Sequence, residues 1–191
     1  MIPPYVAAVE FHEFLTSREI PYAIIGGIAV QFWGEPRGTE DLDLTVMVPI
    51  EKESGLIEEL AARFPSRIPD AAGFARRNRV LLLRASNGVP VDVSLGLPGY
   101  DQQMFQRTQT FSLDPDHEVR VCSAEDLIIH KALAGRGHDL RDIEMVVVAQ
   151  RDRLDVQYIR GWLTFFGDTL ALPDPLARFE TAWRRAQPHS R

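Results

Sequence analysis

The chain has 191 residues, of which 45% are hydrophobic and 25% are charged, and its formal net charge is -6 at pH 7. This balance is typical of a folded globular protein. It argues against a protein that coats nucleic acid nonspecifically, because such binding needs many Lys and Arg side chains to neutralise phosphates. The single cysteine, Cys122, excludes an intramolecular disulfide and a cysteine-based zinc site, and we expect it to be a small buried apolar residue.

The sequence has no feature typical of a membrane protein. No stretch approaches the ~20 consecutive apolar residues that span a bilayer, and the N-terminus lacks a basic segment followed by an uninterrupted apolar one. We therefore expect a cytoplasmic protein with no membrane partner.

Helices and strands are predicted to alternate over the first 120 residues. The expected elements, in chain order, are a helix over 5–18, a strand over 22–25, a helix over 28–34, a strand over 42–48, a helix over 51–64 and two strands over 79–86 and 89–96. The last two strands are joined through Asn87-Gly88, a dipeptide typical of a β-hairpin.

After residue 120 the pattern is almost entirely helical. Four helices are expected, over 123–135, 139–151, 155–166 and 175–186. Ser123, with Asp126 three residues later, is a good N-cap for the first of them. The sequence therefore predicts an α/β part over residues 1–120 and a helical part over residues 121–191.

Carboxylates are expected on one face of two strands. Asp41 and Asp43 are two residues apart, so their side chains are predicted to point the same way, while Leu42 and Leu44 face a core. Asp92 alternates with apolar residues in a later strand and is a third candidate. Adjacent carboxylates repel unless a cation lies between them, and Mg2+ prefers oxygen ligands. Three such groups can hold two metal ions ~4 Å apart for an in-line phosphoryl displacement.

Gly26 and Gly27 stand between a predicted strand and a predicted helix. Without a Cβ, their backbone leaves the N–H groups of the helix N-terminus open to phosphate. A triphosphate held between this turn and a metal on the aspartates is one interpretation. A tight turn and a solvated strand edge are the alternatives for each feature taken alone, so the hypothesis depends on their combination.

Two segments of the chain resemble a known superfamily. The run formed by Gly26, Gly27, Arg37, Thr39, Asp41 and Asp43 resembles the signature of the nucleotidyltransferases related to DNA polymerase β. The segment containing Lys131, Arg136, Asp139 and Asp142 is similar to the second motif block of the AbiEii-type abortive-infection toxins. The resemblance covers roughly residues 20–150. It implies a nucleotidyltransferase fold, with a mixed β-sheet flanked by helices in residues 1–120 and a helical subdomain in residues 121–191.

The resemblance also implies a role for each matching residue. The implied nucleotide-binding residues are Gly26, Gly27, Arg37, Thr39, Lys131, Arg136 and Asp142, and the implied catalytic and metal-binding residues are Asp41, Asp43 and Asp92. Among them, Lys131 would reach the triphosphate, and Asp142 would hold Lys131 or another basic residue in place. Gly27 stands where many members have Ser, and Asp92 is assigned by its strand pattern because no motif fixes the third carboxylate.

The implied activity is transfer of NMP from an NTP such as ATP to an acceptor hydroxyl, with Mg2+ or Mn2+ as cofactor and pyrophosphate leaving. The acceptor would be an RNA end, a protein side chain or a small molecule, and the toxin branch adds a cognate antitoxin as a candidate partner. Two alternatives stay open. One is a noncatalytic nucleotide-binding or antitoxin-like module, which the clustered carboxylates disfavour. The other is a metal-dependent phosphodiesterase that uses water as the nucleophile.

Overall fold

The computed structural model describes residues 1–170 and 172–186. The chain forms two compact units, one made of Met1–Ile28 and Gly38–Cys122, the other of Ala29–Arg37 and the chain from Ser123 onward. Residues 171 and 187–191 of the predicted helical subdomain lie outside the described residues. The domain limit after residue 120 stays a prediction.

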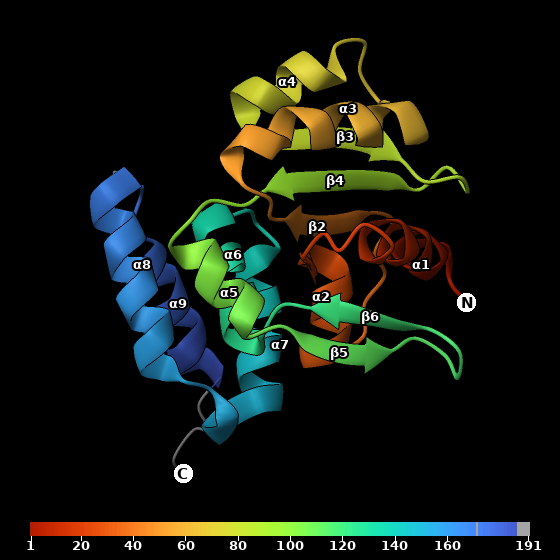
Figure 1. The fold of residues 1–191 in the computed structure, drawn as a ribbon. Coiled ribbons are helices and arrows are strands. Elements are labelled where there is room, and N and C mark those ends of the chain that lie inside the picture. The colour runs from red at the N-terminus through yellow and green to blue at the C-terminus, as the bar shows by residue number, and fades with distance from the viewer. Residues whose placement is uncertain (171, 187–191) are drawn as a thin grey trace. The chain divides into compact units, whose positions relative to one another are not determined.

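Within the part of the chain that the structure describes, six strands form one sheet of the first unit, in the order β3-β4-β2-β1-β6-β5 (Figure 1). The strands are β1 (Tyr22–Ile25), β2 (Leu42–Val46), β3 (Val80–Arg84), β4 (Pro90–Leu95), β5 (Gln109–Ser112) and β6 (Glu118–Val121). Strand β2 pairs antiparallel with β1 and parallel with β4. The predicted α/β class with a mixed sheet is confirmed.

The alternation of side chains along these strands separates a buried face from a polar one. Leu42, Leu44 and Val46 of β2 are buried, as are Val91, Val93 and Leu95 of β4. The predicted hairpin is also confirmed, since β3 and β4 pair antiparallel and Gly88 in their connection has φ +84°. The apolar face therefore builds the core and leaves the other side chains of β2 and β4 on the opposite face.

Four helices belong wholly to the first unit among its described residues. They are α1 (Pro3–Thr16), which packs on β2 and β6, α3 (Glu53–Arg63), which follows a 3-10 turn over Ile50–Lys52, α4 (Ala71–Asn78), which packs on β3, and α5 (Tyr100–Gln106). Cys122 is completely buried, as expected.

Four elements escaped prediction: α4, α5, β5 and β6. Helix α4 is short and ends in the polar run Arg76-Arg77-Asn78, and β5 has side chains that are mostly exposed. Strand β6 alternates correctly but over only four residues. Segments this short carry too few periods to be separated from loops by pattern alone.

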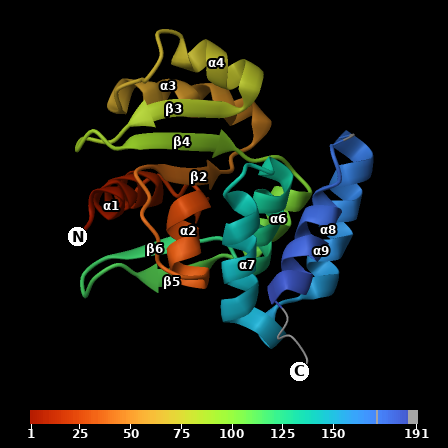
Figure 2. The ribbon, with the colours of Figure 1, turned by 180° about the vertical axis from the view of Figure 1, so that it is seen from behind.

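The second unit contains α6 (Ala124–Ala134), α7 (Asp139–Gln150), α8 (Val156–Leu170) and α9 (Pro175–Ala186), with a 3-10 turn over Arg151–Arg153. Helices α8 and α9 pack side by side (Figure 2). All four predicted helices are confirmed. The Ser123 cap is confirmed too, because its Oγ accepts a hydrogen bond from the Asp126 amide at 3.1 Å. Helix α2 (Gly26–Trp33) contains the boundary between the units, at Ile28.

None of the helices in the described residues combines the length and the hydropathy needed to cross a membrane.

Candidate active site

Two of the predicted carboxylates lie on neighbouring strands. Asp43 of β2 is directly opposite Asp92 of β4, because these strands are parallel and in register. Neighbouring strands are roughly 4.8 Å apart, so both side chains rise from adjacent points on the sheet. The Asp92 side chain is 41% exposed and Asp43 is half-buried. This face of the sheet therefore presents two acidic groups that solvent can reach.

Asp41 comes one residue before β2 begins, in a bend. Its orientation is set by a neighbour, because Thr39 Oγ1 donates a hydrogen bond of 2.8 Å to Asp41 Oδ1. The strand alternation that predicted a common face for Asp41 and Asp43 does not extend to this residue. Thr39, implied as a nucleotide-binding residue, here fixes a carboxylate.

The glycine pair lets these groups approach the start of α2. Gly26 has φ +64°, and a Cβ at position 26 would lie 2.0 Å from Asp43 Oδ2. A Cβ at Gly27 would lie 2.4 Å from Thr39 Oγ1. Gly26 is therefore favoured both for space and for backbone conformation, whereas a side chain at position 27 would have to displace the Thr39 side chain. Because α2 begins at Gly26, its first N–H groups have no acceptor inside the helix, which is the arrangement that the predicted phosphate binding requires.

A second acidic group lies in the helical unit and is buried. The side chains of Asp139 and Asp142 are only 1% and 2% exposed. Lys131 Nζ lies 3.1 Å from Asp139 Oδ1 and 2.7 Å from Asp142 Oδ2, and the Lys131 side chain is itself buried. Arg37 Nε and Nη2 each donate to an oxygen of Asp142 at 2.8 Å, while Arg136 Nε donates to Asp139 at 3.1 Å. We call these five residues the ion-pair network.

Burial and charge act in opposite directions on the two aspartates of the network. Burial is the largest influence on Asp142 and would raise its pKa, but hydrogen bonds and charge from Arg37 and Lys131 together lower the pKa below its usual value. Burial likewise raises the pKa of Asp139, and Arg136 and Lys131 lower it by more. Both carboxylates are therefore ionised at neutral pH.

His138, Asp139 and Asp142 each offer a ligand atom within 4.8 Å of the others, which is a spacing that a metal ion could use. The two carboxylates are already paired with three cations, however, and a divalent ion would have to enter beside the buried Lys131 ammonium. Such like-charge proximity is unfavourable in a buried site. We therefore interpret this cluster as a network of ion pairs.

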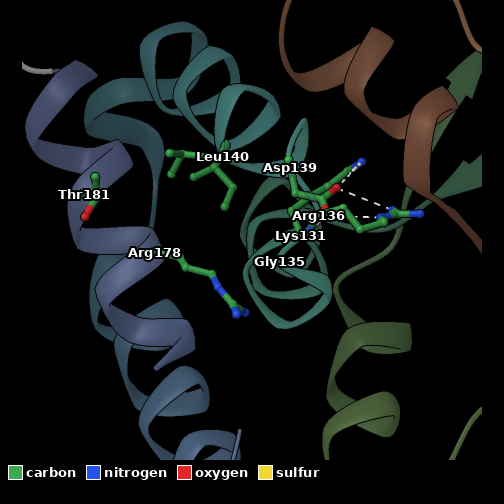
Figure 3. A pocket seen from close by; sticks show the side chains of 9 residues that line it. Lys131, Gly135, Arg136, Asp139, Leu140, Arg178 and Thr181 are labelled. Carbon is green, nitrogen blue, oxygen red and sulfur yellow. Dashed lines mark hydrogen bonds and ion pairs between the residues drawn. The ribbon is translucent and has the colours of Figure 1, made fainter. Parts of the chain in front are cut away.

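A pocket of about 310 Å³ opens beside the ion-pair network (Figure 3). Arg178 of α9 extends toward Gly135, and its Nη1 donates to the carbonyl oxygen of Ala132 at 2.8 Å. Gly135 ends α6 with φ +60°, and a Cβ there would lie 2.3 Å from the Arg178 guanidinium carbon. Arg178 thus satisfies the C-terminus of α6 and contributes a guanidinium to the pocket.

A comparison with known protein families identifies the family of this chain. Residues 17–186 match the profile of the nucleotidyl transferase AbiEii toxin family, a type IV toxin–antitoxin system. The chain belongs to this family. The matched range includes both the glycine and aspartate run of the sheet unit and the ion-pair network. The AbiEii-family chain is therefore a nucleotidyltransferase.

Solved structures support the same fold. An antigenic nucleotidyltransferase-like protein from Paracoccidioides brasiliensis aligns with 92% of this chain and 91% of its own, at 20% identity and a TM-score of 0.55. The antibiotic-resistance factor ANT(2'')-Ia aligns with 89% of this chain and 97% of its own, at 13% identity and a TM-score of 0.57. Its complex with adenylyl-2''-tobramycin aligns with 83% and 94%, at 15% identity and a TM-score of 0.54. A comparison with curated proteins found no match.

Two arginines of the AbiEii-family chain escaped sequence analysis. Arg67 Nη2 contacts Asp92 Oδ1, and Arg178 lines the pocket. Neither lies in a motif, and although Arg178 falls in the predicted helix over 175–186, nothing in that pattern marks it as lining a pocket. The roles assigned to Gly26, Gly27, Arg37, Thr39, Lys131, Arg136 and Asp142 in nucleotide binding stay predictions, as do those of the three sheet-unit aspartates in metal binding.

Proposed function

We propose that this AbiEii-family nucleotidyltransferase is metal-dependent and transfers NMP from an NTP to an acceptor hydroxyl. The observation that carries the proposal is the parallel register that sets Asp43 opposite Asp92, with the Gly26 turn packed against Asp43. Carboxylates and the N-terminus of a helix are the two features that the chemistry needs, one for a metal and one for phosphate.

The residues fit a hard divalent cation. Asp41, Asp43 and Asp92 offer oxygen ligands, which Mg2+ and Mn2+ prefer, and none of the three is fully buried. These three side chains would hold the ion, which supplies electrostatic stabilisation of the charge that develops on the phosphate oxygens. A divalent cation would also relieve the repulsion among the three negatively charged carboxylates.

The chain's own groups would do the rest. The amides at Gly26 and Gly27 would bind phosphate oxygens, and Thr39 would keep Asp41 in place. Asp92 would accept the proton of the acceptor hydroxyl while the acceptor oxygen bonds to the α-phosphorus and the bond from that phosphorus to pyrophosphate breaks. Arg37 and Arg136, which the resemblance assigns to nucleotide binding, have side chains that are 33% and 59% exposed.

The family description supports a biological role for the transfer. We propose that the product is toxic to the cell and that a cognate antitoxin counteracts it. The net charge of -6 favours an acceptor that presents one hydroxyl over one bound along an extended nucleic acid.

The test is transfer of label from each of four alpha-labelled NTPs, with Mg2+, into the RNA, protein and small-molecule fractions of a cell extract. We expect label in one fraction, which names the acceptor class. Asp43→Asn should abolish it, whereas Asp116→Asn, the same change at an exposed loop position of the same unit, should not.

Three results would contradict the proposal. Undiminished transfer by Asp43→Asn would remove Asp43 from the chemistry. Release of free NMP without a labelled acceptor would indicate a phosphodiesterase. Binding of NTP with no label released or transferred would indicate a noncatalytic module.

A further inference from the structure

A cation contacts the carboxylate site of the sheet unit. Arg67 Nη2 donates to Asp92 Oδ1, and the Arg67 side chain is mostly buried, at 24% exposed. Its Nε is buried and has no hydrogen-bond partner within the described ranges 1–170 and 172–186. The guanidinium therefore does not form the two-bond fork with Asp92 that makes arginine–carboxylate pairs strong.

The main chain holds Arg67 beside this site. The Arg67 amide donates to the Leu82 carbonyl at 3.0 Å, and the Arg84 amide donates to the Pro65 carbonyl at 2.8 Å. Residues 65–67 thus run along the outer edge of β3, and Leu82 of β3 lies directly opposite Asp92. Because the backbone anchors Arg67, its guanidinium can leave Asp92 without unfolding this segment.

The three aspartates are consequently unequal. Thr39 contacts Asp41, the Gly26 backbone lies against Asp43, and a positive charge lies against Asp92. A metal ion that binds Asp41 and Asp43 leaves the Arg67 pair intact. An ion that uses Asp92 Oδ1 has to displace Arg67 from that oxygen.

We propose that Arg67 competes with the divalent cation for Asp92, so that Asp92 joins the metal site only when its pair with Arg67 opens. The inference rests on the proposed function, which makes these aspartates metal ligands. The pair is partly exposed and is joined by a hydrogen bond from Arg67 Nη2 to Asp92 Oδ1, and such pairs shift an equilibrium by up to about fivefold. Arg67 therefore weakens metal binding at Asp92 by a modest, measurable factor.

The test is a calorimetric titration of the full chain with Mn2+, without nucleotide. We expect Arg67→Gln to tighten Mn2+ binding about fivefold. Arg84→Gln removes the same charge at the C-terminal end of β3, where Arg84 donates to the Gly88 carbonyl, and should leave the affinity unchanged. Arg67→Met, which keeps a long apolar stem, should behave like Arg67→Gln and serves if the glutamine variant does not fold.

A double-variant cycle separates competition from a general effect of charge. In an Asp92→Asn background, Arg67→Gln should change the Mn2+ affinity by less than about twofold. If Arg67→Gln still tightened Mn2+ binding about fivefold in this background, Arg67 would act through long-range electrostatic repulsion and the proposal would be wrong. An unchanged Mn2+ affinity in the Arg67→Gln single variant would also overturn it.

Failure of the proposed function has a different signature. If Asp43→Asn binds Mn2+ as tightly as the original chain, the metal site itself is wrong, and the inference falls with it. If Asp43→Asn loses Mn2+ binding while Arg67→Gln and Arg67→Met match the original chain, the inference alone is wrong.

Discussion

The chain contains two groups of aspartates whose environments differ. Asp41, Asp43 and Asp92 are half-buried or exposed on the sheet unit, next to a glycine turn, a threonine hydroxyl and one partly exposed pair with Arg67. Asp139 and Asp142 are buried in the helical unit and surrounded by Lys131, Arg37 and Arg136. The sheet-unit aspartates are those for which we propose a metal ion. The aspartates of the helical unit are already paired with Lys and Arg side chains.

This difference shows that proximity of carboxylates does not by itself identify a metal site. A cluster of three candidate ligand atoms within 4.8 Å of one another includes Asp139 and Asp142, yet both carboxylates are already paired with cations. A buried charge is stable only when it is paired, whereas a partly exposed one can exchange water for a ligand. Burial together with the neighbouring charges therefore separates structural carboxylates from chemical ones.

The largest expected difference between the two groups is in stability, and it is measured by removing one charge from each environment. Lys131→Met leaves two buried carboxylates short of a partner, and we expect it to lower the free energy of unfolding by about 3 kcal/mol, which is the cost of breaking a buried pair. Asp43→Asn should change it by less than about 0.5 kcal/mol, because such partly exposed sites contribute little to stability. Urea unfolding of both variants gives the two values.

The comparison would be wrong if Lys131→Met unfolded at the same urea concentration as the original chain. A large loss of stability in Asp43→Asn would also contradict the comparison, because Asp43 would then be needed for the fold.

A smaller effect is expected at the glycine turn. Gly26→Ala places a Cβ against the Asp43 carboxylate at a positive φ, so we expect a loss of about 1–2 kcal/mol in stability together with weaker Mn2+ binding. Gly38→Ala is the matched control, since a Cβ there meets no atom within 4 Å. Thermal unfolding and Mn2+ titration of the pair measure both effects. Equal behaviour of the two variants would show that Asp43 does not depend on the space at Gly26.

The smallest effect concerns pH. The pKa values of Asp139 and Asp142 are lowered in the folded state, so their contribution to stability is present above the unfolded pKa of about 3.9 and is lost as the pH falls through the folded values. Each unit of lowering corresponds to about 1.4 kcal/mol. We measure the thermal unfolding midpoint at a series of pH values from 7 to 2.5. The midpoint should decrease once the pH is below about 4. The decrease should be less steep for Asp142→Asn. Parallel profiles for the two chains would contradict this assignment.

Sequence analysis predicted what depends on neighbours along the chain. The four C-terminal helices, the Ser123 cap and the hairpin through Asn87-Gly88 all follow from periodicity and from residues a few positions apart, and the structure confirms each. The glycine and aspartate run was recognisable because its spacing is itself a pattern. The short elements α4, α5, β5 and β6 were missed because four to eight residues contain too few periods.

Tertiary structure decided which distant residues meet. The register that sets Asp43 opposite Asp92, the contact of Arg67 with Asp92 and the bonding of Arg37 to Asp142 each join residues at least 25 positions apart. Strand pairing and packing create such contacts, and the residues near each partner in the sequence give no signal of them. The order of residues alone therefore shows which residue types are available for nucleotidyl transfer, whereas folding sets which aspartates are buried with counterions and which are accessible to solvent.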